Sequence, residues 1–117
     1  MKIAIIGSRN ITVDNIADYV TAEDEIVSGG AVGADRCAAE YANKNGLKLT
    51  EFLPEYARYG RLAPVIRNRK IVNYADKIIA FWDGNSNGTL LVINYAKKVG
   101  KPCDVIICEA QTSSTTP

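Results

Sequence analysis

Two glycine-bearing stretches are the segments of this chain best suited to binding a ligand. They are residues 28–35, with the sequence SGGAVGAD, and residues 83–89, with the sequence DGNSNGT. Each follows a short apolar run and precedes a helix-like run, so each predicts a strand-to-helix turn. Such a turn exposes backbone N–H groups at the positive end of a helix dipole, and both attract phosphate. Together with residues 7–10, GSRN, after a third apolar run, they predict a phosphate-bearing ligand.

The glycine loops alone do not name that ligand. No Gly-Lys-Ser/Thr sequence follows them, so they are not Walker A loops, and the full dinucleotide fingerprint is absent as well. Gly29, Gly30 and Gly33 are equally compatible with a tight turn packed closely on a sheet. Thr89 after Gly88 can cap a helix instead of binding an anion. Both interpretations of each loop stay open.

Positive charge is expected near the same loops, from Arg9, Arg61, Arg67 and Arg69. Guanidinium groups match the geometry of phosphate. The cluster Arg67-Asn68-Arg69 sits inside an otherwise amphipathic run, where a solvated helix face is the alternative interpretation.

Asp35 is the candidate for a polar role beside the phosphate. It could accept a hydrogen bond from a ribose hydroxyl, orient a water molecule or bind a metal through water. Its position in the first turn of a predicted helix would also stabilise that helix through the dipole, whatever the function.

Composition excludes several classes of chemistry. The chain has no histidine, which removes Ser–His and Cys–His nucleophile pairs, so acid–base chemistry would fall to Asp, Glu, Tyr or Lys. Cys37, Cys103 and Cys108 show no paired spacing and are expected to be core residues rather than a disulfide framework or zinc site. A net charge of +1 argues against a protein that mainly neutralises nucleic-acid phosphates.

The chain of 117 residues, with 47% apolar and 23% charged residues, predicts one soluble domain over residues 1–108. Residues 109–117, rich in Ser and Thr, are expected to form a disordered polar tail. No apolar stretch is long enough to cross a bilayer, and the first one is too short for a signal segment. We therefore expect a cytoplasmic protein without a membrane partner.

Strand-like and helix-like runs alternate along the whole chain. Strands are predicted at residues 2–7, 25–28, 48–53, 77–82 and 103–108. Helices are predicted at residues 13–20 with Thr12 as N-cap, from 34 to 45, from 62 to 75, and after the second glycine loop up to Gly100. This alternation predicts an α/β, Rossmann-like, doubly wound, mostly parallel five-stranded sheet with the order 3-2-1-4-5. Ligands of such sheets bind at the carboxyl ends of the strands, where the three polar loops would meet.

Three aromatic residues lie near that edge. Tyr56 and Tyr59 belong to a polar connector, residues 55–61, that could act as a lid; their rings could stack on a base or fasten the connector to the body. Trp82 ends a predicted strand and is expected to pack in the core with partial exposure.

The ordered motifs resemble those of the SLOG superfamily. The similarity rests on Gly7-Ser8-Arg9, residues 28–35, the Arg67–Arg69 cluster before an apolar strand, and residues 86–89 opening a helix. It covers about residues 1–108. The superfamily joins the DNA-processing (Smf) proteins and the LOG phosphoribohydrolases, and this chain is most similar to its small YspA-like branch.

The resemblance implies a Rossmann-like fold, a nucleotide or nucleotide-derived ligand such as ADP-ribose, NAD or a nucleoside monophosphate, and a homodimer. LOG-type hydrolases pair an arginine, here matched by Arg67 or Arg69, with a glutamate after their Gly-Gly-x-Gly-Thr loop. Here Leu90 and Leu91 follow Thr89, so that acid is missing.

Three functions follow as hypotheses. The first is binding of a nucleotide-type ligand, as in a sensor, and the second is hydrolysis of a nucleoside monophosphate, with Asp35 or Asp83 as catalytic candidates. The third is binding of single-stranded DNA. No metal site is predicted and no cofactor is required, although Mg²⁺ could accompany a nucleotide. The predicted ligand-binding residues are Gly7, Ser8, Arg9, Ser28, Gly29, Gly30, Gly33, Asp35, Arg61, Arg67, Asn68, Arg69, Asp83, Ser86, Gly88 and Thr89.

Overall fold

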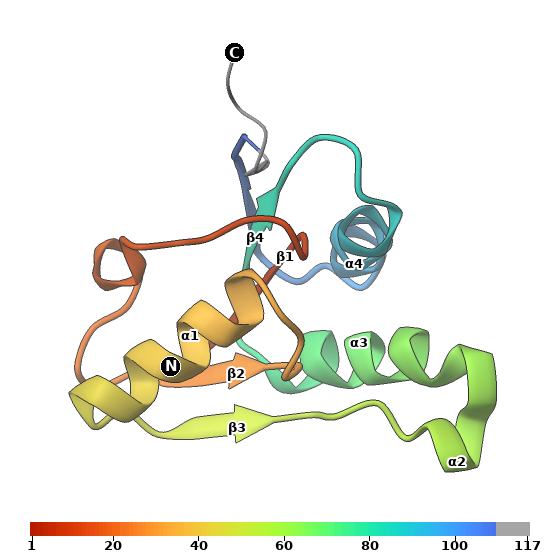
Figure 1. The fold of residues 1–117 in the computed structure, drawn as a ribbon, viewed down its shortest axis with the longest axis horizontal. Helices are drawn as coiled ribbons and strands as arrows, with labels where there is room; N and C mark the ends of the chain where they lie inside the picture. The colour runs from red at the N-terminus through yellow and green to blue at the C-terminus, as the bar shows by residue number, and fades with distance from the viewer. Residues whose placement is uncertain (110–117) are drawn as a thin grey trace.

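A five-stranded, all-parallel sheet forms the centre of the computed structural model, which describes residues 1–109 (Figure 1). The strands are β1 (Lys2–Gly7), β2 (Glu25–Ser28), β3 (Leu49–Glu51), β4 (Lys77–Trp82) and β5 (Cys103–Ile107). Their order in the sheet is β3-β2-β1-β4-β5, with every neighbouring pair parallel. The predicted fold class and strand order are confirmed.

Helices cover both faces of this sheet. The elements are α1 (Ala34–Asn45), α2 (Tyr56–Tyr59), α3 (Ala63–Tyr74) and α4 (Asn87–Lys98), with 3₁₀ turns η1 (Ile16–Asp18) and η2 (Gly60–Leu62). Helix α1 packs on one face and α3 and α4 pack on the other (Figure 1). Because side chains alternate along a strand, Ile3 and Ile5 of β1 face α1, whereas Ala4 and Ile6 face α3 and α4.

Small and β-branched residues let the layers approach closely. Ala34, Ala38 and Ala42 recur every four residues on α1 and are fully buried against the sheet. On the same face the ring of Tyr19 meets that of buried Phe81 edge-on, with centroids 5.3 Å apart. This packing fixes α1 over β1 and thereby the position of the loop that precedes α1.

The segment 13–20 does not form the predicted helix. Only the short turn η1 forms, although Val13, Ile16 and Val20 are buried against the sheet, as an amphipathic helix would have buried them. The segment is rich in β-branched residues, Asp and Asn, which favour other backbone conformations over a helix. The spacing of Val13, Ile16, Ala17 and Val20 predicted a helix with these four residues inward: three of them are buried, but Ala17 is exposed, no helix forms, and Thr12 caps no helix there.

The remaining elements differ from the predictions mainly at their ends. Strand β3 is shorter than residues 48–53, and the connector 55–61 contains the single turn α2 and then η2. Lys70 of α3 pairs with Glu55 at 3.1 Å and ties this connector to α3. Of the predicted tail, residues 110–117 lie outside the described residues. Within residues 1–109, no helix is long and apolar enough to cross a membrane.

Replacement of Ile16 tests whether the irregular segment really forms part of the core. Ile16 is 3% exposed, so Ile16→Ala should lower the free energy of unfolding by about 2–4 kcal/mol. Ile107, on the edge strand β5, is 66% exposed. Ile107→Ala should therefore change the free energy of unfolding by less than about 0.5 kcal/mol. Urea unfolding of both variants measures the difference, and equal small effects would contradict the packing described.

Candidate functional site

A pocket of about 260 Å³ lies at the carboxyl end of β1, between the starts of α3 and α4. Strand order reverses here, since β2 lies on one side of β1 and β4 on the other. We call it the edge pocket. It brings together many of the predicted site residues, namely Gly7, Arg9, Asp35, Arg67, Asn68, Ser86, Gly88 and Thr89, and adds Ile6, Ala31, Pro64 and Val92.

Asp35 is the buried acid of the edge pocket, with 6% of its surface exposed. Its Oδ2 accepts hydrogen bonds from the N–H groups of Gly29 (3.2 Å) and Ala31 (3.4 Å). The N–H of Gly30 donates to Ser28 Oγ at 3.4 Å, and that hydroxyl donates to the main-chain carbonyl of Asp35 at 3.2 Å. Amides predicted to hold phosphate are thus already hydrogen-bonded, and the loop is wrapped around the Asp35 carboxylate.

Burial raises the pKa of Asp35 to about 6, because it disfavours the charged carboxylate. The Ala31 amide, the Arg67 guanidinium and the Gly29 amide act in the opposite direction and keep the pKa from rising further. A carboxyl group with this pKa changes its protonation state near neutral pH, which is a property of acid–base groups and of pH-sensitive binding sites.

Arg67 is held in place inside the same pocket. Its Nη1 donates to the carbonyl of Gly29 at 2.6 Å, and its Nε donates to Asn68 Oδ1 at 2.7 Å. A Cβ atom at Gly29 would lie 2.6 Å from that Nη1, so the guanidinium occupies the space that a side chain would need. The absence of a side chain at Gly29 therefore positions a cation, and the cation is already oriented before a ligand arrives.

Gly7 and Gly33 allow close packing around the pocket. Gly33 has φ +82°, and a Cβ atom there would lie 2.5 Å from the carbonyl oxygen of Ser8. At Gly7 a Cβ atom would lie 2.6 Å from the carbonyl oxygen of Phe81 and 2.7 Å from Ala34 Cβ. The tight-turn interpretation therefore describes Gly33 well, and both glycines bring the end of β1 and the loop after it against the start of α1.

The start of α4 supplies the second anion-attracting feature. Its N-cap, Ser86, makes no side-chain capping hydrogen bond within the part of the chain that the structure describes. Gly88 and buried Thr89 lie in its first turn, and no heavy atom would come within 4 Å of a Cβ at Gly88. The positive end of the helix dipole therefore lies at the edge pocket, which Arg67 also lines.

The carboxylate of Asp83 binds amides of its own loop. Its Oδ1 accepts from the amides of Ser86 (2.7 Å) and Asn85 (2.9 Å), and these bonds lower its pKa. The Asp83 N–H donates to Ser8 Oγ at 3.3 Å, which joins the loop after β4 to the loop after β1. Asp83 is not among the residues lining the edge pocket.

Several predicted residues lie outside the pocket wall. Ser8, Ser28, Gly29, Gly30 and Gly33 do not line it, Gly33 lines a neighbouring hollow, and Arg61 is exposed on η2.

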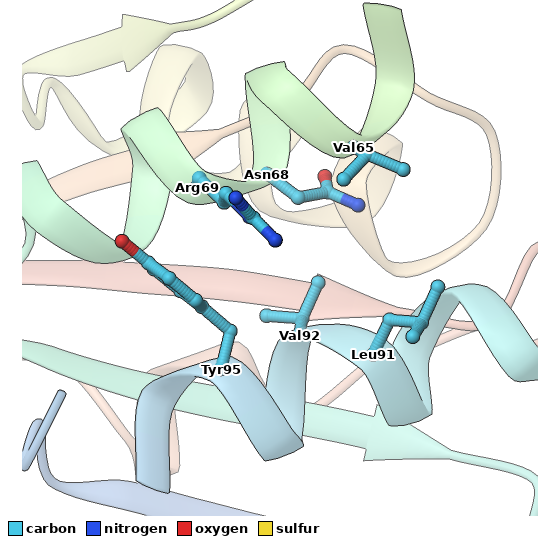
Figure 2. Close-up of a pocket in the computed structure, with 6 residues that line it drawn as sticks. All are labelled: Val65, Asn68, Arg69, Leu91, Val92 and Tyr95. Atoms are coloured by element: carbon cyan, nitrogen blue, oxygen red, sulfur yellow. The ribbon is translucent and has the colours of Figure 1, made fainter. Parts of the chain in front are cut away.

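Arg69 lines a different hollow of about 70 Å³, which we call the α3–α4 groove: Val65, Asn68, Arg69, Leu91, Val92 and Tyr95 (Figure 2). Tyr95 was not among the residues predicted from the sequence, although it lies four residues after Leu91 and so shares a face of α4 with it.

Trp82 is half-buried, as expected, and its Nε1 donates to the Ser86 carbonyl at 2.9 Å.

A third hollow, more open and about 410 Å³ in volume, lies on the other side of Arg9. Arg36, Cys37 and Glu40 of α1 contribute to it, but Arg67 and the start of α4 do not. The edge pocket is therefore the better candidate for an anionic ligand. Among residues 1–109 there is no group of three or more His, Cys, Asp and Glu side chains arranged to hold a metal ion.

Comparison with known families gives one match. The model of the YspA, cpYpsA-related SLOG family (YAcAr) matches residues 1–59. The matched part contains β1, the Gly29–Asp35 loop, α1 and β3, whereas Arg67 and the start of α4 follow it. No curated protein matches the chain.

Two glycines test the packing around the pocket. Gly33→Ala should lower the free energy of unfolding by about 2 kcal/mol or more, because the new Cβ meets the Ser8 carbonyl at a positive φ. Gly88→Ala should leave the free energy of unfolding unchanged or raise it by up to about 1 kcal/mol, because a Cβ at Gly88 has room in the helix. Chemical denaturation compares them, and equal tolerance at both sites would be inconsistent with the close approach at Gly33.

The pKa of Asp35 predicts a specific pH dependence of stability. A carboxyl whose pKa rises from 3.8 to about 6 on folding binds its proton more tightly in the folded state, so its contribution to stability falls as the pH rises through that interval. Asp35→Asn removes this dependence. The stability of the variant relative to the native protein should therefore improve by about 2 kcal/mol between pH 4.5 and 7.5. Urea unfolding at both pH values measures it, and a constant difference would contradict the raised pKa.

Proposed function

The chain belongs to the YspA, cpYpsA-related SLOG family, and from this premise we propose that it binds a nucleotide or nucleotide-derived ligand in the edge pocket. The candidates are ADP-ribose, NAD-like compounds and nucleoside monophosphates. The observation that carries the proposal is the Arg67 guanidinium, fixed by Gly29 and Asn68 in the same pocket as the start of α4. A phosphate there would meet a preorganised cation and helix amides together.

The charges of the pocket support an anion with a hydroxyl-bearing part. Arg9 and Arg67 contribute two positive side chains, and Asp35 contributes one acid. Arg9 is exposed and lines the pocket, where it could approach a second phosphate or the ligand's outer edge. Asp35 offers an acceptor for a ribose hydroxyl while it is ionised. These features together fit a phosphate joined to a sugar.

The raised pKa of Asp35 supports a second candidate, hydrolysis of a nucleoside monophosphate. General acid–base groups work best when their pKa lies near the working pH, and Asp35 meets this condition beside Arg67. Asp83 is the weaker candidate because its carboxylate accepts from amides of its own loop. Release of free base from AMP by the native protein and not by Asp35→Asn would support this activity, and no release above the blank would remove it.

Binding can be tested with AMP and ADP-ribose at millimolar concentration. At ten times Kd a ligand should stabilise the protein by about 1.4 kcal/mol, which is a rise of roughly 5 °C in Tm. Arg67→Ala should weaken binding by about 10- to 100-fold, because a charge-assisted hydrogen bond contributes about 1.5–3 kcal/mol. Isothermal titration calorimetry measures the affinities.

Arg36→Ala serves as the matched control, because it removes an exposed arginine of α1 that does not line the edge pocket. Its affinity should stay within about twofold of the native value. Arg67→Lys separates charge from geometry: it keeps the positive charge but loses the planar fork, so an intermediate affinity is expected. The absence of any ligand-induced shift in Tm for the native protein would overturn the proposal.

A further inference from the structure

The α3–α4 groove adjoins the edge pocket. Asn68 of α3 and Val92 of α4 line both of them, so the two hollows share a wall and lie next to each other. Along α4, Leu91 and Tyr95 follow Gly88 by three and seven residues, which places them about 4.5 and 10.5 Å further along the helix axis. A molecule anchored by phosphate at the start of α4 can therefore extend along the helix into the groove.

The groove has the chemistry of a site for a flat aromatic ring. Val65, Leu91 and Val92 give it aliphatic walls, and the 57% exposed Leu91 leaves its side chain accessible to a ligand. Figure 2 shows the Arg69 guanidinium and Val92 between Tyr95 and Leu91. Aliphatic contacts, a planar cation and an aromatic ring together favour stacking of a planar ring.

The Arg69 guanidinium lies over the ring of Tyr95. The guanidinium carbon lies 5.2 Å from the centre of the Tyr95 ring, and Tyr95 is itself fixed by its hydroxyl, which donates to Asn73 Oδ1 at 3.0 Å. Asn68 accepts the Arg67 hydrogen bond through Oδ1, so its amide nitrogen is the atom that can donate to an acceptor on the edge of a ring.

We propose that the α3–α4 groove is the subsite for the base of the nucleotide ligand, with Arg69 and Tyr95 as stacking residues. This inference rests on the proposed function, since the phosphate in the edge pocket sets where the base can reach. It gives the two arginines different tasks: Arg67 holds the phosphate, and Arg69 contacts the base. The base-stacking aromatic residue is then Tyr95, rather than Tyr56, Tyr59 or Trp82.

The test compares AMP with ribose 5-phosphate, which carries the same sugar phosphate without a base. The native protein should bind AMP at least about fivefold more tightly, because stacking of one base contributes about 1–3 kcal/mol. Arg69→Ala and Tyr95→Leu should each reduce this ratio to below threefold while the affinity for ribose 5-phosphate stays within twofold. Titration calorimetry gives both affinities, and circular dichroism verifies that each variant is folded.

Lys98→Ala is the matched control, since it removes one positive charge at the last residue of α4, away from the groove; it should keep the native ratio. Equal affinities of the native protein for the two compounds would overturn the base subsite and leave the edge pocket standing. So would an Arg69→Ala variant that weakens both compounds alike, because Arg69 would then act on the phosphate. If neither compound binds the native protein, the proposed function fails and the base subsite fails with it.

Discussion

The buried carboxylate of Asp35 is the constraint on which the rest of the candidate site depends. A carboxyl group buried at the edge of a sheet needs hydrogen-bond partners, and it finds them in the amides of Gly29 and Ala31. Those bonds fix the loop after β2, and the Gly29 carbonyl then holds Arg67. One buried acid of α1 thereby sets the position of a cation on α3, so the two helices on opposite faces of the sheet are linked at its carboxyl edge.

The pattern of apolar and polar residues within each segment was enough to predict most of the fold. Continuous apolar runs such as residues 2–7 and 77–82 predict strands covered on both faces, and the structure has β1 and β4 there. The helix expected at 62–75 is α3 at Ala63–Tyr74, with Pro64 in its first turn, where a missing N–H does no harm. The segment 13–20 shows the limit: apolar spacing identified its large buried side chains, but Ala17 is exposed because the backbone does not form the helix on which that spacing depends.

The sequence predicted which loops line the candidate pocket, but it did not predict the hydrogen bonds between them. Parallel topology alone places the loops after β1, β2 and β4 at one edge, which is why so many of the predicted residues line one pocket. That the Gly29 amide serves Asp35, and that Gly33 is required by the Ser8 carbonyl, depends on contacts between distant segments. No spacing within a single segment encodes such contacts.

The two arginines of α3 illustrate the same limit. Residues two apart on a helix are separated by about 200° around its axis, so Arg67 and Arg69 must point in nearly opposite directions. The sequence therefore says that only one of them can face a given pocket. Which one faces the sheet edge is decided by the rotation of α3, and that rotation is set by burial of Ile71 and Val72 against the sheet.

Asp35 also links ligand binding in the edge pocket to binding of a proton by its own carboxyl group. Part of what favours its ionised form is the nearby Arg67 guanidinium. A phosphate bound to Arg67 would bring negative charge close to Asp35 and offset that influence, so it would raise the pKa of Asp35 above about 6. By linkage, such a ligand binds together with a proton, and its affinity increases as the pH falls toward 6. The protonated carboxyl can still accept the loop amides through one oxygen and donate to the ligand through the other. The residue that organises the edge pocket is thus able to contact the ligand without releasing the loop.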